Sequence, residues 1–298
     1  MTKLVLVIST LGLFFAFDAC RMNANVQEKG SSSLLWKVYG NDLKDTSYLY
    51  GTIHIQDKRV FEYGEAVEKA FQKSDKVAVE VLMDRIDPST MMDVMFMEDT
   101  TLDMLLSEKE YARLEEAYKN ITGAGLETAN RLKPFFISAN MIQSLMPRDM
   151  AMPLDMHFIQ QARKADKTVV GLETLDEQIA IIDDLSYTRQ MNMLMESIED
   201  VDKMKDQFKE LVDAYLNMDK QRVMKLMEDP SLPEDFMDNL LDKRNKLMVS
   251  RMQPLFKTSG TFVAVGAAHL YGEEGLINML RQKGYQVEPV KFAFEIED

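Results

Sequence analysis

The feature that most constrains the fold is a set of four short apolar runs, each ending in a side chain that can bind a metal ion. They are YLYGTIH, VAVE, VVGLE and VAVGAAH, which end in His54, Glu80, Glu173 and His269. In open α/β sheets, ligand sites lie beyond the carboxyl ends of the strands. If the four runs form parallel strands, these side chains meet at one edge. The sequence therefore predicts an α/β fold in which strands from both ends of the chain converge on one site.

The two ends of the chain supply most of the predicted strands. Residues 34–40 and 48–55 are strand-like and flank a turn, which predicts a β-hairpin. The chain closes with a strand at 260–269, a helix at 272–284 and a strand at 285–294. This is the spacing of a β-α-β unit.

The large middle of the chain is predicted to be helical, with two strands set into it. The strands are residues 76–81 and 168–173. Thr174 and Glu177 form the T-x-x-E pattern of a capping box, which marks the start of a helix. Helical periodicity covers residues 63–74, 101–120, 132–146, 153–167 and 178–252, and Pro-Ser-Leu-Pro at 230–233 interrupts the last stretch.

Two of the four runs share a Gly-x-x-His pattern, with Gly51 before His54 and Gly266 before His269. A glycine lets the backbone turn, or come close to another segment where a side chain would block it. The histidine three residues later then points into the crevice beyond the strand. The pattern is weak on its own, because a histidine at a strand end is also compatible with a structural role.

Two imidazoles and one or two carboxylates suit a catalytic divalent metal. Such an ion polarises a carbonyl group and acidifies a bound water. Glu80 is the most informative residue, because a carboxylate at the end of a fully apolar strand must be paired, coordinated or exposed to solvent. A carboxylate that is not needed as a ligand is a candidate general base.

The third histidine, His157, lies in the sequence PLDMHF. Asp155 is two residues away, so on a helix the two side chains point to different sides. We expect Asp155 to cap the amino end of this helix. His157 is equally compatible with packing and with function, and both residues are secondary candidates for the site.

Residues 1–19 have the features of a secretory signal peptide. Lys3 precedes a largely apolar run from Leu4 to Phe17, which is short of the about 20 residues that a membrane-spanning helix needs. Cys20, the only cysteine, follows in a sequence similar to a lipobox, so it is either lipidated or an inert thiol of the signal segment. We expect an exported bacterial lipoprotein at the cell envelope, facing the periplasm, or a secreted protein if Cys20 is not lipidated.

Residues 20–33 are then a lipidated cysteine and a flexible tether. Residues 34–298 are predicted to form a single domain, either as one large unit or as two intimate lobes. The formal net charge of −14 disfavours nucleic acid as a partner. The partners we expect are a peptide or small-molecule substrate and, through the lipid anchor, a membrane.

Several stretches together resemble the TraB/GumN family, in the order in which that family has them. They are YLYGTIHI, VAVEV, PLDMHFIQQA with KTVVGLETLDEQ, RNKLM, and FVAVGAAHLYGEEGLINMLRQKGYQV, between about Trp36 and Val290. Each stretch is weak alone, and the ordered set is more specific. The family is related to the Tiki metalloproteases and, more distantly, to erythromycin esterase and the haem-binding ChaN lipoproteins.

The resemblance implies roles for particular residues. The hallmark of the family is two Gly-x-x-His motifs and a strand-end glutamate, which correspond to His54, His269 and Glu80. Tiki-type members are membrane-anchored peptidases that depend on manganese or cobalt. The resemblance therefore implies a divalent metal, manganese or cobalt first and zinc as an alternative, with these three residues at its centre.

Arg244 and Asn245 match a recurrent Arg-Asn pair of the same family. An arginine there would hold a substrate carboxylate or a developing oxyanion, or would form a surface salt bridge instead. Glu173 also matches, although capping and helix-dipole roles compete with a role in the site.

These observations predict a metal-dependent hydrolase, in the form of a Tiki-like metallopeptidase that acts on peptides outside the cytoplasm. One alternative is a non-catalytic haem- or metal-binding lipoprotein of the ChaN type, in which Tyr39, Tyr48, Tyr50 or Tyr271 would bind iron. Another alternative is a regulator that sequesters peptides without cleaving them.

Overall fold

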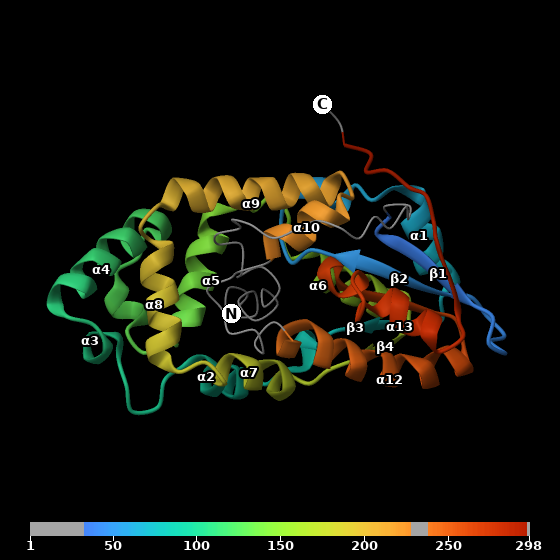
Figure 1. Ribbon diagram of the computed structural model, residues 1–298, viewed down its shortest axis with the longest axis horizontal. Helices are drawn as coiled ribbons and strands as arrows, with labels where there is room; N and C mark the ends of the chain where they lie inside the picture. The colour runs from blue at the N-terminus through green and yellow to red at the C-terminus, as the bar shows by residue number, and fades with distance from the viewer. Residues whose placement is uncertain (1–32, 228–237, 297–298) are drawn as a thin grey trace.

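A six-stranded sheet forms the centre of the computed structural model, which describes residues 33–227 and 238–296 (Figure 1). The order of the strands across the sheet is β4-β3-β5-β2-β1-β6. The strands are β1 (Leu35–Tyr39), β2 (Ser47–Thr52), β3 (Lys76–Val79), β4 (Thr168–Gly171), β5 (Thr261–Gly266) and β6 (Gln286–Pro289). The α/β fold class is therefore confirmed.

The four runs with metal-competent ends form β2, β3, β4 and β5, and these strands are parallel. β5 pairs in parallel with both β2 and β3, and β3 pairs in parallel with β4. β1 is antiparallel to β2, as the predicted hairpin requires. The carboxyl ends of the four runs thus lie at one edge of the sheet, as the sequence predicts.

The closing β-α-β unit differs in detail from the prediction. β6 runs in the same direction as β5, because it is antiparallel to β1, which is itself antiparallel to β2. Two strands separate β5 from β6, however, and α13 (Leu276–Gln282) connects them. The last strand also ends at Pro289 and does not reach residue 294; one further backbone hydrogen bond, from Val290 N–H to the carbonyl of Leu35 at 2.8 Å, follows it.

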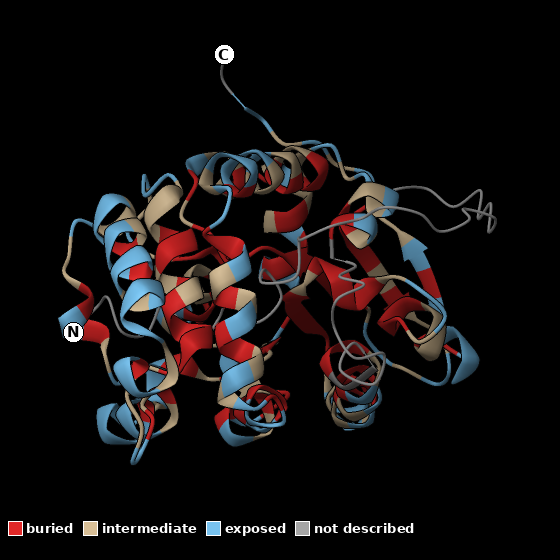
Figure 2. Cartoon of the chain, turned by 60° about the vertical axis from the view of Figure 1, so that its left-hand side comes forward, coloured by how far each residue is buried: buried red, intermediate tan, exposed pale blue. Residues whose placement is uncertain are grey.

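Helices cover both faces of the sheet, and Figure 2 shows their buried sides turned towards it. On one face, α1 (Gly64–Lys73) and α6 (Leu154–Lys164) share a hydrophobic core with the strands. On the other face, α12 (Arg244–Thr258) and α13 do the same. These layers hold the carboxyl edge of the sheet in a fixed position.

A second, helical region lies beside the sheet and has hydrophobic cores of its own (Figure 1). α9 (Val201–Leu216) connects the two regions, since Met204 packs in the helical core and Leu211 and Tyr215 pack in the core of the sheet. The further helices are α2 (Pro88–Met95), α3 (Leu102–Leu105), α4 (Glu108–Thr122), α5 (Pro134–Leu145), α7 (Leu175–Asp183), α8 (Tyr187–Ser197), α9 (Val201–Leu216) and α10 (Lys220–Met227). Short 3-10 segments occur at Lys58–Phe61, Met83–Arg85, Leu126–Ala129 and Ala267–Leu270, and a π turn at Asp238–Lys243.

The predicted helix starts are mostly where the sequence places them. Thr174 and Glu177 form a complete capping box at the start of α7. The stretch 101–120 is a helix pair, because Ser107 caps α4 in a second capping box. The prediction for Asp155 is wrong: Pro153 is the cap of α6, and Asp155 lies inside the first turn.

Some predictions fall on parts of the chain that the structure does not describe. The signal segment, Cys20, nearly all of the tether and the interruption at 230–233 lie outside the described residues. Among the helices in the described ranges, none has both the length and the apolar character that crossing a membrane requires.

Candidate metal centre

The strand ends bring the predicted residues together around Glu80. Glu80 follows β3 directly, and His54 follows β2 by two residues. His269 lies in the 3-10 turn after β5. Glu173 follows β4, and its backbone N–H donates to the carbonyl of Glu80 at 2.8 Å. One glutamate thus stands between two histidines and a second glutamate, each from a different strand.

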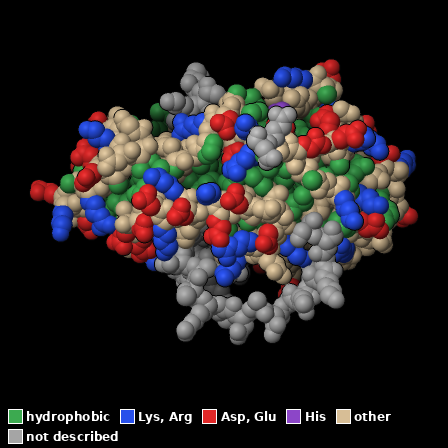
Figure 3. Space-filling model, turned by 90° about the horizontal axis from the view of Figure 1, so that it is seen from above, with side chains coloured by type: hydrophobic (Ala, Val, Ile, Leu, Met, Phe, Trp, Pro, Cys, Tyr) green, Lys and Arg blue, Asp and Glu red, His purple; other side chains and the backbone are tan. Residues whose placement is uncertain are grey.

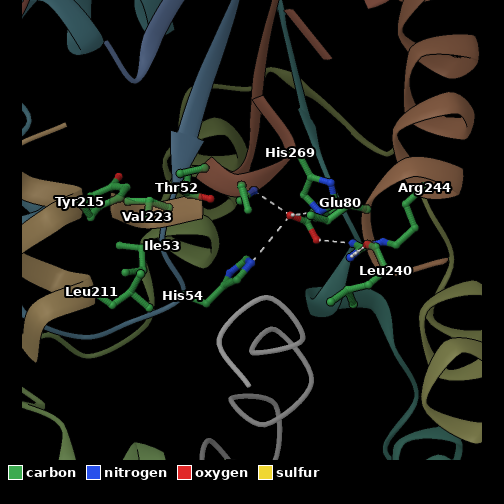
Figure 4. Close-up of a pocket in the computed structure, with 14 residues that line it drawn as sticks. Thr52, Ile53, His54, Glu80, Leu211, Tyr215, Val223, Leu240, Arg244 and His269 are labelled. Atoms are coloured by element: carbon green, nitrogen blue, oxygen red, sulfur yellow. Dashed lines mark hydrogen bonds and ion pairs between the residues drawn. The ribbon is translucent and has the colours of Figure 1, made fainter. Parts of the chain in front are cut away.

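The Oε1 atom of Glu80 is the point on which the two imidazoles converge (Figure 4). Nε2 of His54 and Nε2 of His269 each lie 3.8 Å from it. The backbone N–H of Gly266 donates to the same oxygen at 2.7 Å. Both histidines are buried. Their Nε2 atoms therefore face one carboxylate oxygen inside the protein.

The Oε2 atom of Glu80 is held by α7 and α12. Nη2 of Arg244 donates to it at 2.7 Å, and Nε2 of Gln178 donates at 3.1 Å. Nε and Nη2 of Arg244 also donate to the two oxygens of Glu173, at 2.8 and 2.7 Å. Arg244 is buried and forms an internal ion pair with two carboxylates, so the alternative of a surface salt bridge is not observed.

This network limits what Arg244 and Glu173 can do. Four of the five N–H groups of Arg244 donate to described residues, the fourth of them to the carbonyl of Leu240. Both oxygens of Glu173 are occupied by Arg244. Arg244 and Glu173 are therefore placed to hold Glu80 in position.

The second nitrogen of each imidazole has a partner on a helix. Nδ1 of His269 is 2.7 Å from Oδ1 of Asn245, whose Nδ2 donates to the carbonyl of Glu274. Because that bond assigns the amide oxygen to His269, Nδ1 carries the proton and Nε2 keeps its lone pair. Nδ1 of His54 lies 2.8 Å from Oδ1 of Asp155, close enough for a charge interaction, although the contact does not qualify as a hydrogen bond. Partners of this kind orient histidine ligands of metals.

The surroundings shift the pKa values of the three central side chains, Glu80, His54 and His269, in different directions. Burial alone would raise the pKa of Glu80, but Arg244 and the two histidines hold it well below its usual value. Burial lowers the pKa of His54, yet Asp155 and Glu80 together raise it to about 10. Burial and the charge of Arg244 lower the pKa of His269 to about 3. The acidic surroundings thus favour the protonated, cationic form of His54, while His269 stays neutral.

The two glycines of the Gly-x-x-His patterns are needed for close approach, and neither has a positive φ. A Cβ on Gly266 would lie 3.2 Å from Oε1 of Glu80 and 4.0 Å from Nε2 of His54. A Cβ on Gly51 would lie 2.8 Å from Cδ1 of Leu270 and 3.0 Å from Cα of Ala267. Gly266 therefore keeps the space between the donors open, and Gly51 lets the 3-10 turn that carries His269 pack on β2.

The donor atoms are of a kind that binds divalent ions, and the distances from the two imidazoles to Glu80 are compatible with a shared ion. Two ligands that are each about 2.1 Å from one ion can be up to about 4 Å apart. Both distances of 3.8 Å from the imidazoles to Glu80 meet this condition. Three carboxylates and one guanidinium leave the centre negative, which suits a cation. In the described ranges, however, no group of three or more His, Cys, Asp or Glu side chains has an arrangement that could hold a metal ion as it stands.

Other candidate residues lie elsewhere. His157 contacts Tyr63 at 3.2 Å and packs edge-on against Phe61, and its pKa is lowered by burial. The four tyrosines considered as iron ligands do not gather: Tyr39 bonds Glu288, and Tyr271 donates to the carbonyl of Ser33 at 2.8 Å. Tyr48 and Tyr50 pack with the core of the sheet. Neither His157 nor any of these four tyrosines lines either of the two pockets beside Glu80.

Two pockets flank the candidate metal centre. The larger has about 540 Å³ of free space, part of it open to solvent, and contains His54, Glu80, Arg244 and His269 (Figure 4). The smaller, on the side of Asp155, has about 280 Å³. Both pockets therefore reach residues that the sequence singles out.

Sequence reasoning missed two contributors to this region. Gln178 bonds both glutamates, and Tyr215 lines the larger pocket. Gln178 ends the stretch KTVVGLETLDEQ that carries the family resemblance, but nothing in that stretch marked it as a site residue, and Tyr215 comes from a distant helix. Only the folded chain brings them to the strand ends.

This sheet, with its two Gly-x-x-His strand ends and the strand-end Glu80 between them, defines the class of protein. The chain belongs to the TraB/PrgY/gumN family, whose model matches residues 34–289.

Individual relatives are similar at a lower level. The chain is 23% identical to a protein named metalloprotease TIKI2 of Danio rerio, over 88% of this chain and 62% of the relative. It is 24% identical to metalloprotease TIKI1 of Xenopus tropicalis, over 95% of this chain and 66% of the relative. It is 24% identical to a metalloprotease TIKI homolog of Nematostella vectensis, over 98% of this chain and 76% of the relative. The matches thus span slightly less than two thirds of the first two relatives. No solved structure matches the chain.

Proposed function

We propose that this protein is a metal-dependent hydrolase, and that it is a peptidase. The observation that carries the proposal is the convergence of Nε2 of His54 and Nε2 of His269 on Oε1 of Glu80, from three parallel strand ends. The relatives that are named metalloproteases support the choice of peptides as substrates. A small-molecule substrate for the same chemistry is the alternative within this class.

His54, His269 and Glu80 are the residues that would hold the ion, for which manganese or cobalt is proposed first and zinc second. A divalent ion supplies Lewis acidity for the attack of water on a carbonyl group. Asn245 keeps the lone pair of His269 on Nε2, and Asp155 holds the ring of His54.

The contacts of Glu80 favour one of its two predicted roles. Its low pKa, set by Arg244 and the histidines, makes it a poor acceptor of a proton at neutral pH. A carboxylate that stays ionised is well suited to binding a cation. We therefore propose that Glu80 is a ligand and that Arg244 positions it.

The proposed place of action is outside the cytoplasm. The support is the signal-like sequence of residues 1–19 and the cysteine that follows it. Anchoring through a lipid on Cys20, and with it contact with a membrane, is part of the same proposal.

A peptide-library experiment tests the function. The protein is incubated with manganese, cobalt or zinc, and the products are identified by mass spectrometry. We expect cleavage that a chelator removes and that Glu80→Gln abolishes. The matched control is Glu288→Gln, which alters an exposed strand glutamate that pairs with Lys37 at 2.8 Å. Cleavage that survives Glu80→Gln would contradict the proposal, and binding of peptides or haem without cleavage would favour the non-catalytic alternatives.

A further inference from the structure

The larger pocket beside the candidate metal centre has two chemically different sides (Figure 4). One side consists of the donors His54, Glu80 and His269, with Arg244 behind Glu80. The other side is apolar and is built by Ile53, Leu211, Tyr215 and Val223, whereas Leu240 lies beside Arg244. Both sides belong to one continuous pocket. A molecule that reaches the donors therefore also touches the apolar wall.

The apolar wall is built from helices that are anchored to the sheet. Leu211 and Tyr215 lie on α9, and Val223 lies on α10. All three belong to the hydrophobic core that includes β2 and β5. Oη of Tyr215 donates to the carbonyl of Gly51 at 2.8 Å, which ties α9 to the strand that leads to His54. The wall is thus fixed in position relative to the donors.

The apolar side of the pocket offers no charge to a ligand group, and the charged groups on the donor side are engaged with one another. Among its lining residues, the charges of Glu80 and Arg244 are already paired at 2.7 Å. Arg244 also pairs with Glu173. A charged side chain that entered the apolar side of the pocket would lose water without gaining a partner there, which is unfavourable. An apolar side chain would gain free energy from burial against the wall.

We propose that this pocket selects a bulky apolar side chain, aliphatic or aromatic, next to the peptide bond that is presented to Glu80 and the two histidines. The inference rests on the proposed function, because it assigns the substrate class of that same site. It predicts that peptides with leucine or phenylalanine at this position bind better than peptides with glycine, aspartate or lysine there.

The test measures binding separately from cleavage. N-acetyl-leucine amide and N-acetyl-glycine amide are titrated into the protein, and binding is followed by nuclear magnetic resonance. Burial of a leucine side chain predicts binding that is at least about tenfold tighter than for glycine. Equal binding of the two amides would overturn the proposal.

A matched pair of variants locates the effect. Val223→Leu enlarges a residue that lines the pocket, so it is expected to lower the leucine-to-glycine preference about fourfold, the effect of one buried methylene. Val212→Leu makes the same change in the same hydrophobic core, but Val212 does not line the pocket. It is expected to lower the melting temperature, because it overpacks the core, and to leave the preference unchanged. A preference that is unchanged in Val223→Leu would overturn the proposal.

A second variant keeps the test decisive if Val223→Leu does not fold. Val223→Ala enlarges the pocket, and it is expected to raise the affinity for N-acetyl-phenylalanine amide relative to the leucine compound. An unchanged ratio of the affinities for the phenylalanine and leucine compounds would overturn the proposal that this pocket binds the side chain.

The experiments distinguish a failure of the proposed side-chain preference from a failure of the proposed peptidase activity. Cleavage of library peptides without any preference for apolar residues would overturn the pocket and leave the hydrolase standing. Preferential binding of the leucine compound, sensitive to Val223→Leu but without cleavage of any peptide, would support the pocket and remove the peptidase.

Discussion

At the scale of single residues, the chemistry depends on the carboxylate of Glu80. One of its oxygens faces two imidazole nitrogens, and the other is held by Arg244 and Gln178. Each group around it has few alternative partners, because the cluster is buried. A change at one residue is therefore expected to alter the whole cluster.

Removal of the central arginine tests how the cluster is held together. Arg244→Met leaves Glu80 and Glu173 buried without a counter-charge, so we expect the free energy of unfolding to fall by about 3–5 kcal/mol. The measurement is urea unfolding of chelator-treated protein. Arg251→Met is the control on the same helix, where the arginine is partly exposed and a loss below about 1 kcal/mol is expected. Equal losses in the two variants would show that the buried pair has no special role.

The two glycines should behave differently when each is replaced by alanine. Gly266→Ala places a methyl group between the donors, so we expect metal affinity to fall at least about tenfold while the protein still folds. Gly51→Ala forces a clash with Ala267 and Leu270, so we expect a loss of stability of about 1–3 kcal/mol. Calorimetric titration and urea unfolding distinguish the two effects. Unchanged metal affinity in Gly266→Ala would contradict this assignment.

At the scale of the elements, the sheet supplies the donors and the helices orient them. Four parallel strands deliver His54, Glu80, Glu173 and His269 to one edge. α6 adds Asp155, α7 adds Gln178, and α12 adds Arg244 and Asn245. α7 and α12 must therefore keep a fixed relation to each other for Glu80 to be held from both.

An ion pair between α7 and α12 contributes to this relation and gives a pH prediction. Hydrogen bonding to Arg251 lowers the pKa of Glu177 from 4.5 to about 2. Its contribution to stability is therefore present above pH 4.5 and is lost as the pH falls towards 2. We expect Glu177→Gln to be less stable than the wild type at pH 6, by less than about 1 kcal/mol because the pair is partly exposed.

The stability gap between Glu177→Gln and the wild type should close as the pH is lowered through this range in urea unfolding. The control is Asp176→Asn, an exposed acid in the same first turn of α7. A gap that stays constant from pH 6 to pH 2.5 would show that the charge of Glu177 is not responsible.

At the scale of the whole molecule, the acidic side chains do not form one patch on the face seen in Figure 3. Acidic and basic side chains are interspersed on that face. The negative charge that matters for the proposed site is internal. Binding of a cation there would stabilise the folded state, because the unfolded chain has no such cluster.

This coupling predicts a thermal shift. At a manganese or cobalt concentration one hundred times Kd, the stabilisation is about 2.7 kcal/mol. For a chain of this size, that corresponds to a rise in Tm of about 4–5 °C. Differential scanning calorimetry of the wild type and of Asp155→Asn measures it. We expect a smaller shift in the variant, and equal shifts would remove Asp155 from the site.

Much of the fold could be predicted from the sequence because it follows local rules. The hairpin, the short buried strands and the capping box at Thr174 each arise from neighbouring residues. Strand-end side chains of parallel strands must share an edge, so His54, Glu80 and His269 could be grouped before the structure was known. The close packing behind Gly51 follows from the same pattern.

The remainder depends on tertiary contacts that no local pattern encodes. Asp155 reaches His54 because Pro153, one residue before the helix, takes the cap position expected for the aspartate. Gln178 and Tyr215 come from helices whose placement on the sheet is set by packing. The far position of β6 depends on β1 and β2, which precede it by more than 200 residues.

Metal content is the measurement that tests most directly whether His54, His269 and Glu80 form one metal centre. The wild type, His54→Ala and His269→Ala are incubated with manganese, cobalt and zinc, freed of unbound ions, and analysed by mass spectrometry, with circular dichroism to confirm folding. The expected result is near-stoichiometric metal in the wild type and its loss in both variants. A wild type that stays free of metal, or a folded variant that retains it in full, would contradict the proposed centre.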